Sequence, residues 1–178
     1  IGSGATAVTI VPVMAQSAAK VTMLQRTPTW MASRPARDKF ANTLRRILPS
    51  KWAYSITRFK NINWQRLVYH RALKAPDKVG QTLLDMARKQ LPDSIDIKRH
   101  LTPPYGPWEQ RLCLVPDNDM FNAVKRGTAR LVTDHIAGFD AGGVKLQSVD
   151  YLPADLVITA TGLRMALAGK VAISKDGA

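Results

Sequence analysis

The sequence predicts an α/β fold that is interrupted by a helical insertion, and three features of the chain support this. A glycine-rich turn at the first residues precedes a helix-like run and then a short β-branched run. A basic stretch with helical spacing follows from 34 to about 100, and strand-like segments return after it. With 178 residues, of which 46% are hydrophobic, the chain has the size of one domain and is expected to bury a core.

The first half of the chain predicts one helix, one strand and then a group of helices. Ala, Val and Met dominate residues 5–19, which predicts a helix, and KVTMLQ at 20–25 predicts a strand. Prolines at 49, 76 and 92 divide the basic stretch, so three helices are expected in the insertion at about 36–100.

The second half predicts short elements that alternate. Three prolines and a glycine in TPPYGPW require a loop at 102–108. A helix at 117–125, a strand at 129–132, a hairpin around 141–143 and a buried strand at 155–162 (DLVITATG) are expected after it. The glycine turn at the start normally closes a strand upstream, and an Asp-Gly turn near the end calls for a returning strand. The chain is therefore expected to be an internal fragment of a longer protein.

The sequence also bears on membrane insertion, disulfide bonding and metal binding. No apolar run approaches the roughly 20 residues of a membrane-spanning helix. Cys113 is the single cysteine, so no internal disulfide forms, a packed thiol is expected and a cytoplasmic protein is predicted. His70, His100 and His135 lie far apart without cysteine partners, so no metal site is predicted.

The basic excess, 26 Lys and Arg against 13 Asp and Glu, has two interpretations. Basic and aromatic residues interleave in the insertion, as in proteins that bind nucleic acid or an anionic membrane surface. Because the charges are dispersed over several helices, a solvated helical face is favoured and no nucleic-acid partner is expected. A stand-alone basic module that binds nucleic acid or a membrane, and peripheral membrane association through these helices, stay open as alternatives.

The opening turn has the G-x-G-x-x-A form of a dinucleotide-binding turn. The first glycine permits a tight turn, the second lets backbone approach a pyrophosphate, and the helix that follows offers unpaired N–H groups. A turn of small residues that serves structure alone is the alternative. The candidate cofactor-binding residues in this turn are Gly2, Ser3, Gly4, Ala5 and Thr6.

The end of the strand at 20–25 bears on the cofactor. NAD sites place an acidic residue about 20 residues after the glycines, whereas this chain has Arg26 and Thr27 there. A guanidinium suits the 2′-phosphate of NADPH, which it binds through two hydrogen bonds. The sequence therefore predicts NADPH binding at Arg26 and Thr27, and a solvated surface arginine is the alternative.

Four segments together resemble flavin-dependent Baeyer-Villiger monooxygenases: GSGATAVTIVP, VTMLQRTPTW, PPYGPWEQRLCLVPDNDMF and DLVITATGL. The resemblance implies a Rossmann-like NADPH-binding domain at 1–162 within a flavoprotein that has a second, FAD-binding domain. Residues 163–178 would then be the truncated start of the return into the FAD domain. FAD rests on the resemblance alone, because no FAD-binding turn occurs in the chain.

The resemblance also implies an activity and the residues that carry it. In this family NADPH reduces the flavin, and a C4a-peroxyflavin formed with O2 oxidises ketones or sulfur and nitrogen centres, including those of thioethers and thioamides. Arg111 matches the active-site arginine that stabilises the anionic peroxyflavin, and Gln110 is expected to contact cofactor. A structural ion pair is the alternative for Arg111. Alone, the fragment is expected to be inactive.

The segment ATG, formed by Ala160, Thr161 and Gly162, matches the place where the family's chain leaves the NADPH domain. Small residues there would let backbone approach a cofactor, and a buried strand that ends in a glycine turn is the structural alternative.

Overall fold

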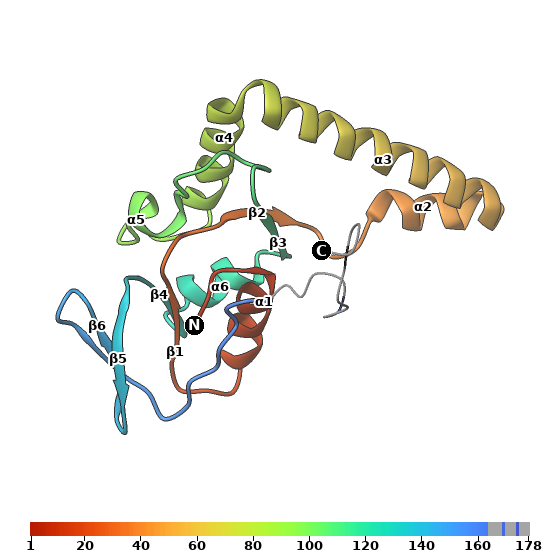
Figure 1. Ribbon diagram of the computed structural model, residues 1–178. Helices are drawn as coiled ribbons and strands as arrows, with labels where there is room; N and C mark the ends of the chain where they lie inside the picture. Colours follow the sequence, from red (N-terminus) through yellow and green to blue (C-terminus); the bar gives the residue numbers. More distant parts are fainter. Residues whose placement is uncertain (164–168, 170–173, 175–178) are drawn as a thin grey trace.

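The computed structural model describes residues 1–163, 169 and 174 and has a mixed α/β architecture in which a run of helices separates two groups of strands (Figure 1). In chain order the elements are α1 (Ala5–Met14), β1 (Val21–Gln25), β2 (Trp30–Arg34), α2 (Lys39–Ile47), α3 (Ser50–Lys74), α4 (Pro76–Arg88), α5 (Ile97–Leu101), β3 (Leu112–Pro116), α6 (Asp119–Lys125), β4 (Ala129–Thr133), β5 (Ile136–Asp140), β6 (Gly143–Leu146) and β7 (Tyr151–Pro153).

Two parallel strand pairs organise the described part of the chain. β1 pairs with β4 and β2 pairs with β3, whereas β5, β6 and β7 form a separate antiparallel sheet. In the first pair Gln25 lies opposite Thr133, so both strands end at the same edge. Residues that follow β1 and β4 are therefore brought together, as ligand-binding residues are in open α/β sheets.

The core lies between α1, β1, β3 and α6. Val8, Met23, Val115, Met120 and Ala123 are almost fully buried there. Large-to-small substitutions at such positions typically cost about 2 to 5 kcal/mol. This cluster fixes α1 against the sheet and with it the turn at the helix start.

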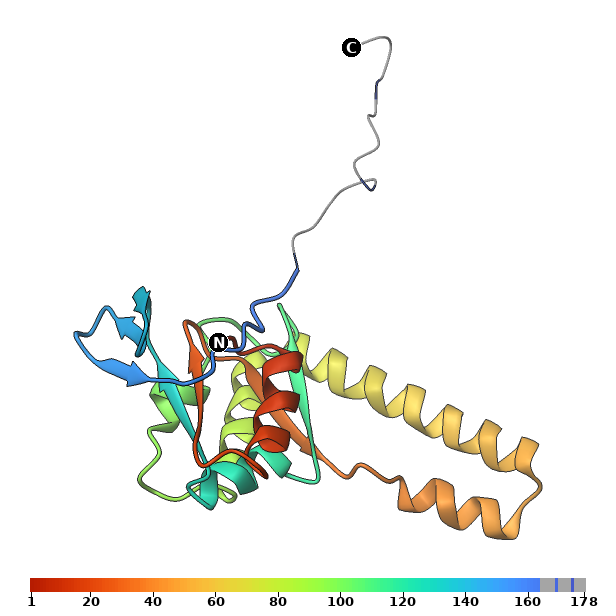
Figure 2. The same cartoon turned by 90° about the horizontal axis from the view of Figure 1, so that it is seen from below.

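The helical insertion is joined to the strands mainly through α4. Gly80 of α4 faces the ring of Trp30 on β2, and a Cβ at this glycine would lie 2.9 Å from Trp30 Cη2. The Trp30 indole N–H donates to the Tyr105 carbonyl at 2.7 Å, which fixes the ring and the loop after α5. From this attachment α2 and α3 project away from the body as a helical hairpin (Figures 1 and 2).

The structure confirms the strand near 20–25, the helix near 117–125, the strand near 129–132 and the hairpin around 141–143. It corrects three expectations. The first helix ends at Met14 instead of residue 19, the insertion holds four helices instead of three, and β2 and β3 were not predicted. Gln16 and Ser17 close the helix end with i to i−3 hydrogen bonds to Val13 and Met14, which tighten the last turn and stop it.

The predicted buried strand at 155–162 is wrong. The segment is largely exposed and has no regular strand, with Leu156 exposed at 70%. Its described backbone hydrogen bonds link it only to Ile1, through Ala160 N–H to the Ile1 carbonyl at 2.7 Å and the Ile1 amine to the Ile158 carbonyl at 2.7 Å. Pairing with a single residue does not form a strand, because a strand needs a neighbouring strand that hydrogen-bonds its backbone over several residues.

The expected return at 163–178 falls almost entirely outside the described residues, and the Asp-Gly turn near the end falls outside them altogether. Among the described residues, no helix is long and apolar enough to cross a membrane.

Candidate functional site

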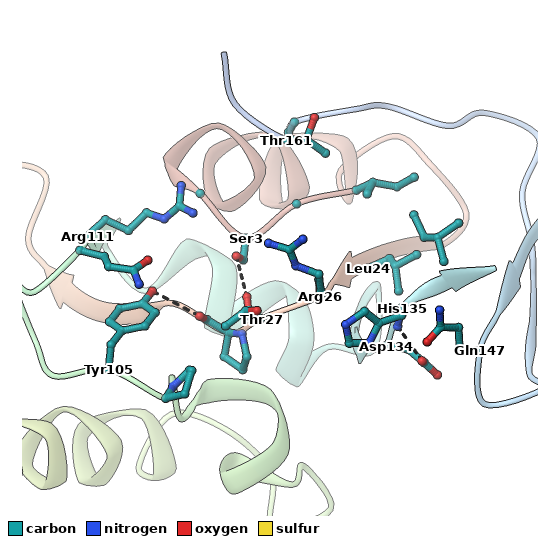
Figure 3. Close-up of a pocket in the computed structure, with 18 residues that line it drawn as sticks. Ser3, Leu24, Arg26, Thr27, Tyr105, Arg111, Asp134, His135, Gln147 and Thr161 are labelled. Carbon is teal, nitrogen blue, oxygen red and sulfur yellow. Dashed lines mark hydrogen bonds between the residues drawn. The ribbon is translucent and has the colours of Figure 1, made fainter. Parts of the chain in front are cut away.

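A cavity of about 690 Å³ lies at the edge where β1 and β4 end. Segments far apart in the sequence form its walls: the opening turn, the residues after β1, the loop before β3, the residues after β4 and the segment at 160–161 (Figure 3). Its volume falls within the roughly 300 to 1,000 Å³ of small-molecule sites. The lining residues are Ile1, Gly2, Ser3, Gly4, Leu24, Arg26, Thr27, Pro28, Pro104, Tyr105, Gln110, Arg111, Asp134, His135, Ile136, Gln147, Ala160 and Thr161.

The glycine-rich turn is held tightly against its neighbours. Gly2 donates its N–H to the Leu24 carbonyl at 2.8 Å and has φ of +128°, which an L side chain rarely adopts. A Cβ at Gly2 would also collide with the Ala160 carbonyl. The Ser3 hydroxyl donates to the Thr27 carbonyl at 2.8 Å and ties the turn to the residues after β1. Glycine is therefore required at position 2 by both conformation and space.

The start of α1 has free capacity for an anion. Gly4 is the N-cap, no side chain caps the helix, and its first turn contains no acidic residue. The first N–H groups of a helix lack partners within it and carry the positive end of the helix dipole. Because Gly4 lines the cavity, these groups lie where a phosphate would be bound.

Two guanidinium groups stand in the cavity. Arg26 and Arg111 both line it, and neither has a side-chain hydrogen bond or an ion pair with another described residue. Arg111 reaches the turn, since its Nη1 lies 3.1 Å from the position of a Cβ on Gly4. In the close-up both guanidinium groups lie near Ser3 (Figure 3). Two cations beside an uncapped helix start form a site suited to a polyanion.

Tyr105 forms the wall opposite the turn. Its hydroxyl lies 3.4 Å from the Pro28 carbonyl and from Thr29 Oγ1, and its carbonyl accepts the Trp30 indole N–H at 2.7 Å. The loop before β3 is thereby fixed to the segment that follows β1. This wall places Gln110 and Arg111 at the cavity.

Sequence reasoning missed Asp134 and His135, which follow β4 and line the cavity beside Arg26 (Figure 3). Asp134 Oδ1 accepts the backbone N–H of His135 at 2.6 Å, which fixes the carboxylate at the strand end. A signal was available, because a strand was predicted at 129–132 and parallel strands end at one edge. Tyr105 and Gln147 carry no such signal in the sequence.

The structure brings most of the predicted site residues together. Gly2, Ser3, Gly4, Arg26, Thr27, Gln110, Arg111, Ala160 and Thr161 line the one cavity. Ala5 and Thr6 form the first turn of α1 behind the lining, and Gly162, with φ of +94°, lies one residue beyond it.

Cys113 is buried, as predicted. Burial raises the pKa of its thiol, which is opposed by a contact with Thr29 Oγ1 at 4.0 Å and by the charge of Arg111. A thiol held protonated in this way is a poor nucleophile, so Cys113 serves packing.

The chain is similar to curated proteins over essentially its whole length. It is 48% identical to the FAD-containing monooxygenase EthA of Mycobacterium tuberculosis over 178 residues, which is 99% of this chain and 36% of that protein. It is 45% identical to the probable FAD-binding monooxygenase AlmA of Acinetobacter baylyi, again over 99% of this chain and 36% of that protein. The putative FAD-containing monooxygenase MymA of M. tuberculosis is 43% identical over 100% of this chain and 37% of its own length. The chain thus spans about a third of these relatives, and no protein-family model matches it.

Proposed function

The chain is homologous over its whole length to part of the FAD-containing monooxygenases, and from this premise we propose that it is the NADPH-binding portion of a flavin monooxygenase. We propose residues 1–162 as a Rossmann-like domain that binds NADPH, with α2 to α5 as its helical insertion. The activity of the whole protein, the insertion of one oxygen atom of O2 into a ketone or its transfer to a sulfur or nitrogen centre, is part of the same proposal.

The observation that carries this proposal is that one cavity holds an uncapped helix start and two guanidinium groups, neither of which pairs with another side chain in the described part of the chain. NADPH carries a pyrophosphate and a separate 2′-phosphate, so it needs two anion sites within one groove. The turn at Gly2 and Gly4 offers the first, and Arg26 offers the second. A ligand with a single anionic group would leave one of the two sites without a partner.

Individual residues have distinct roles in the proposal. Backbone N–H groups of the turn and of Ala5 and Thr6 would hold the pyrophosphate, and Arg26 with Thr27 would hold the 2′-phosphate. The segment formed by Ala160, Thr161 and Gly162 would lie against the glycine turn and complete the cofactor site. Its backbone already packs so closely on Gly2 that a Cβ there would collide with the Ala160 carbonyl.

Arg111 and Gln110 would serve the reacting end of the cofactor. A guanidinium remains charged at any working pH, so Arg111 stabilises developing negative charge without donating its proton. Its place against the turn, at the mouth of the loop before β3, allows it to contact a bound dinucleotide.

The residues present fit NADPH and do not by themselves provide a second dinucleotide site. Within the described residues, the turn at Gly2 and Gly4 is the one that joins a G-x-G-x-x-A pattern to a helix start, so no residue of this chain is assigned to FAD. When bound, NADPH supplies a hydride and FAD supplies the reaction with O2.

Calorimetric titration of the purified protein tests the proposal. NADPH is expected to bind at one site with clearly higher affinity than NADH, because NADH lacks the group that Arg26 would bind. Equal affinity for both nucleotides would contradict a site selective for NADPH. If neither nucleotide bound and nucleic acid bound in a salt-sensitive way, the result would contradict a dinucleotide site and favour a basic binding module.

A further inference from the structure

The hairpin formed by α2 and α3, residues 39–74 and here called the basic hairpin, has an unusual charge distribution. It contains nine Lys and Arg and no Asp or Glu. The preceding carboxylate, Asp38, is engaged, since it accepts from the Ala41 N–H at 3.1 Å and from Lys60 Nζ at 3.1 Å. These contacts lower the pKa of Asp38 and keep it ionised. The hairpin is therefore cationic along its whole length.

Many large apolar side chains of α3 are also exposed. Ala53 and Ala72 are buried on the packed side, whereas large apolar residues face solvent, with Trp52 exposed at 67% and Phe59 at 73%. Large apolar side chains are normally buried in globular proteins, and many of them exposed on one element indicate an interaction surface. The exposed large residues of α3 are Trp52, Tyr54, Ile56, Phe59, Ile62, Trp64, Leu67, Tyr69 and Leu73.

Three of these residues share one face at the start of α3. Trp52, Ile56 and Phe59 follow the i, i+4, i+7 spacing, and Asn63, Arg66 and His70 are the polar residues that follow along the same face. The other exposed apolar residues lie on several sides of α3, which has 25 residues and a length of roughly 37 Å. Figures 1 and 2 show this helix projecting beyond the strands, with α2 along one side.

We propose that the basic hairpin docks on an anionic phospholipid surface. Aromatic and aliphatic side chains flanked by Lys and Arg are the combination that binds at the boundary of headgroups and acyl chains, where the apolar groups enter and the cations meet lipid phosphates. This proposal is independent of the NADPH site, because the basic hairpin does not line the cavity.

Charge and chemistry favour lipid over other occupants. A protein interface over the hairpin would need a partner that supplies carboxylates for many of its nine cations, since burying such cations without partners is costly. Nucleic acid would satisfy the cations through its phosphates, but the exposed isoleucines and leucines would gain little from it. A lipid surface satisfies both groups at once.

Co-sedimentation of the intact protein with vesicles tests the proposal. Vesicles of phosphatidylcholine that contain phosphatidylglycerol are expected to bind it, whereas vesicles of phosphatidylcholine alone are expected to bind it far less. Binding should weaken as salt rises, because surface charges are then screened.

Two variants with matched controls locate the surface. Phe59→Ser is expected to weaken vesicle binding at least about tenfold, since burial of one aromatic side chain is lost. Arg66→Gln is expected to weaken it roughly fivefold, the usual effect of one cation near an anionic surface. Phe139→Ser, at a residue 58% exposed on β5, and Lys125→Gln on α6 are expected to leave it unchanged. Thermal unfolding of each variant verifies that it is folded.

Other results would overturn the proposal. No binding to anionic vesicles would mean that other polypeptide covers the hairpin. Equal losses in the variants and the controls would mean that binding is not localised there. Binding of RNA or DNA that depends on Arg66 and not on Phe59, without vesicle binding, would assign the surface to nucleic acid. Self-association that depends on Phe59, again without vesicle binding, would assign it to a second copy of the chain.

Discussion

Arg26 and Arg111 differ from the other residues of the cavity because each brings a full charge that no described neighbour neutralises. In the proposed function, the anionic groups of the bound nucleotide are the partners of these two charges. Both arginines can be replaced at small cost to stability, so their effects on binding and reaction are separable from folding.

Arg26→Ala is expected to weaken NADPH binding and to leave NADH binding almost unchanged. Loss of a charge-assisted contact with the 2′-phosphate costs about 1.5 to 3 kcal/mol, which is roughly 10- to 150-fold in affinity. Calorimetric titration with both nucleotides measures this. Arg126→Ala, at an exposed arginine after α6, serves as the control and should change neither affinity. If Arg26→Ala weakened both nucleotides equally, Arg26 would have no role in selecting between them.

In the proposed flavin monooxygenase, Arg111→Ala is expected to separate NADPH consumption from product formation. Removal of one charge that acts on a reacting group commonly costs about 3 to 4 kcal/mol, so product should form roughly 100- to 1,000-fold more slowly while NADPH oxidation continues. Arg111→Lys should recover part of the rate, since it keeps the charge and loses the planar donors. Oxygen uptake, NADPH oxidation and product formation, measured together, give the ratio of product formed to NADPH oxidised. An unchanged ratio would mean that Arg111 has a structural role only.

His100 links the insertion to β4 and gives stability a dependence on pH. Its Nδ1 lies 2.8 Å from Thr133 Oγ1, which also accepts from Gln25 Nε2 at 2.9 Å. Burial, aided by the charge of Arg99, lowers the pKa of His100 below 6.5. The folded protein favours the neutral ring, so this stabilisation is complete above about pH 6.5 and is lost as the pH falls through the lowered value.

The melting temperature is accordingly expected to fall between about pH 7 and about pH 5, and to fall less in His100→Gln. His70→Gln, at an exposed histidine on α3, should keep the slope of the original protein. A His100→Gln variant with the same slope would show that another group causes it.

Residues of the site could be predicted where one segment carries the chemistry. The turn and Arg26 lie within 26 residues of each other and follow a known spacing, so sequence sufficed to propose them. Tyr105, Asp134 and Gln147 reach the cavity from distant segments, and their participation depends on how β2 to β6 are arranged. Proximity of that kind is not encoded in any local pattern.

At the scale of elements, the contact of α4 with β2 depends on one missing side chain. Gly80 lies inside a helix, where alanine would usually stabilise by about 1 kcal/mol. Here a Cβ would come within 2.9 Å of Trp30, whose ring is 6% exposed and fixed by its hydrogen bond to Tyr105.

Gly80→Ala is therefore expected to destabilise the protein, since overpacking costs typically about 1 to 3 kcal/mol and exceeds the gain in helix propensity. Denaturant unfolding followed by circular dichroism measures the change. Gly138→Ala is the control, because no atom lies within 4 Å of its Cβ position. A more stable Gly80→Ala variant would mean that Trp30 moves freely and that the contact does not position α4.

Helices and strands could be predicted where the pattern lies within one segment. They could not be predicted where pairing with a distant segment determines the structure. α6 and the β5–β6 hairpin follow from a run of apolar residues and a glycine turn. β2 and β3 become strands because they pair with each other across the whole insertion, and TWMASR alone shows no clear alternation. The opposite error occurred at 155–162, which has the composition of a strand but pairs only with Ile1.

For the molecule as a whole, the cavity joins segments from both ends of the sequence, so a ligand within it should stabilise the entire fold. At about 100 times its dissociation constant a ligand adds about 2.7 kcal/mol to the free energy of unfolding. For a chain of this size the melting temperature should rise by roughly 5 to 10 °C with NADPH. Differential scanning fluorimetry measures the shift, and Arg26→Ala should reduce it. A shift of equal size with inorganic phosphate alone would indicate a general anion effect.

The two parallel strand pairs also set the order in which this chain acquires its structure. Gln25 and Thr133, partners in β1 and β4, are 108 positions apart, and the whole insertion separates β2 from β3. Closing such long loops is entropically unfavourable until other contacts shorten them, and contacts of this kind slow folding. The helices of the insertion and the β5–β6–β7 meander have near neighbours in sequence and are able to form early. The cavity, built where the distant strands end, is thus expected to be the last part of the molecule that is completed during folding.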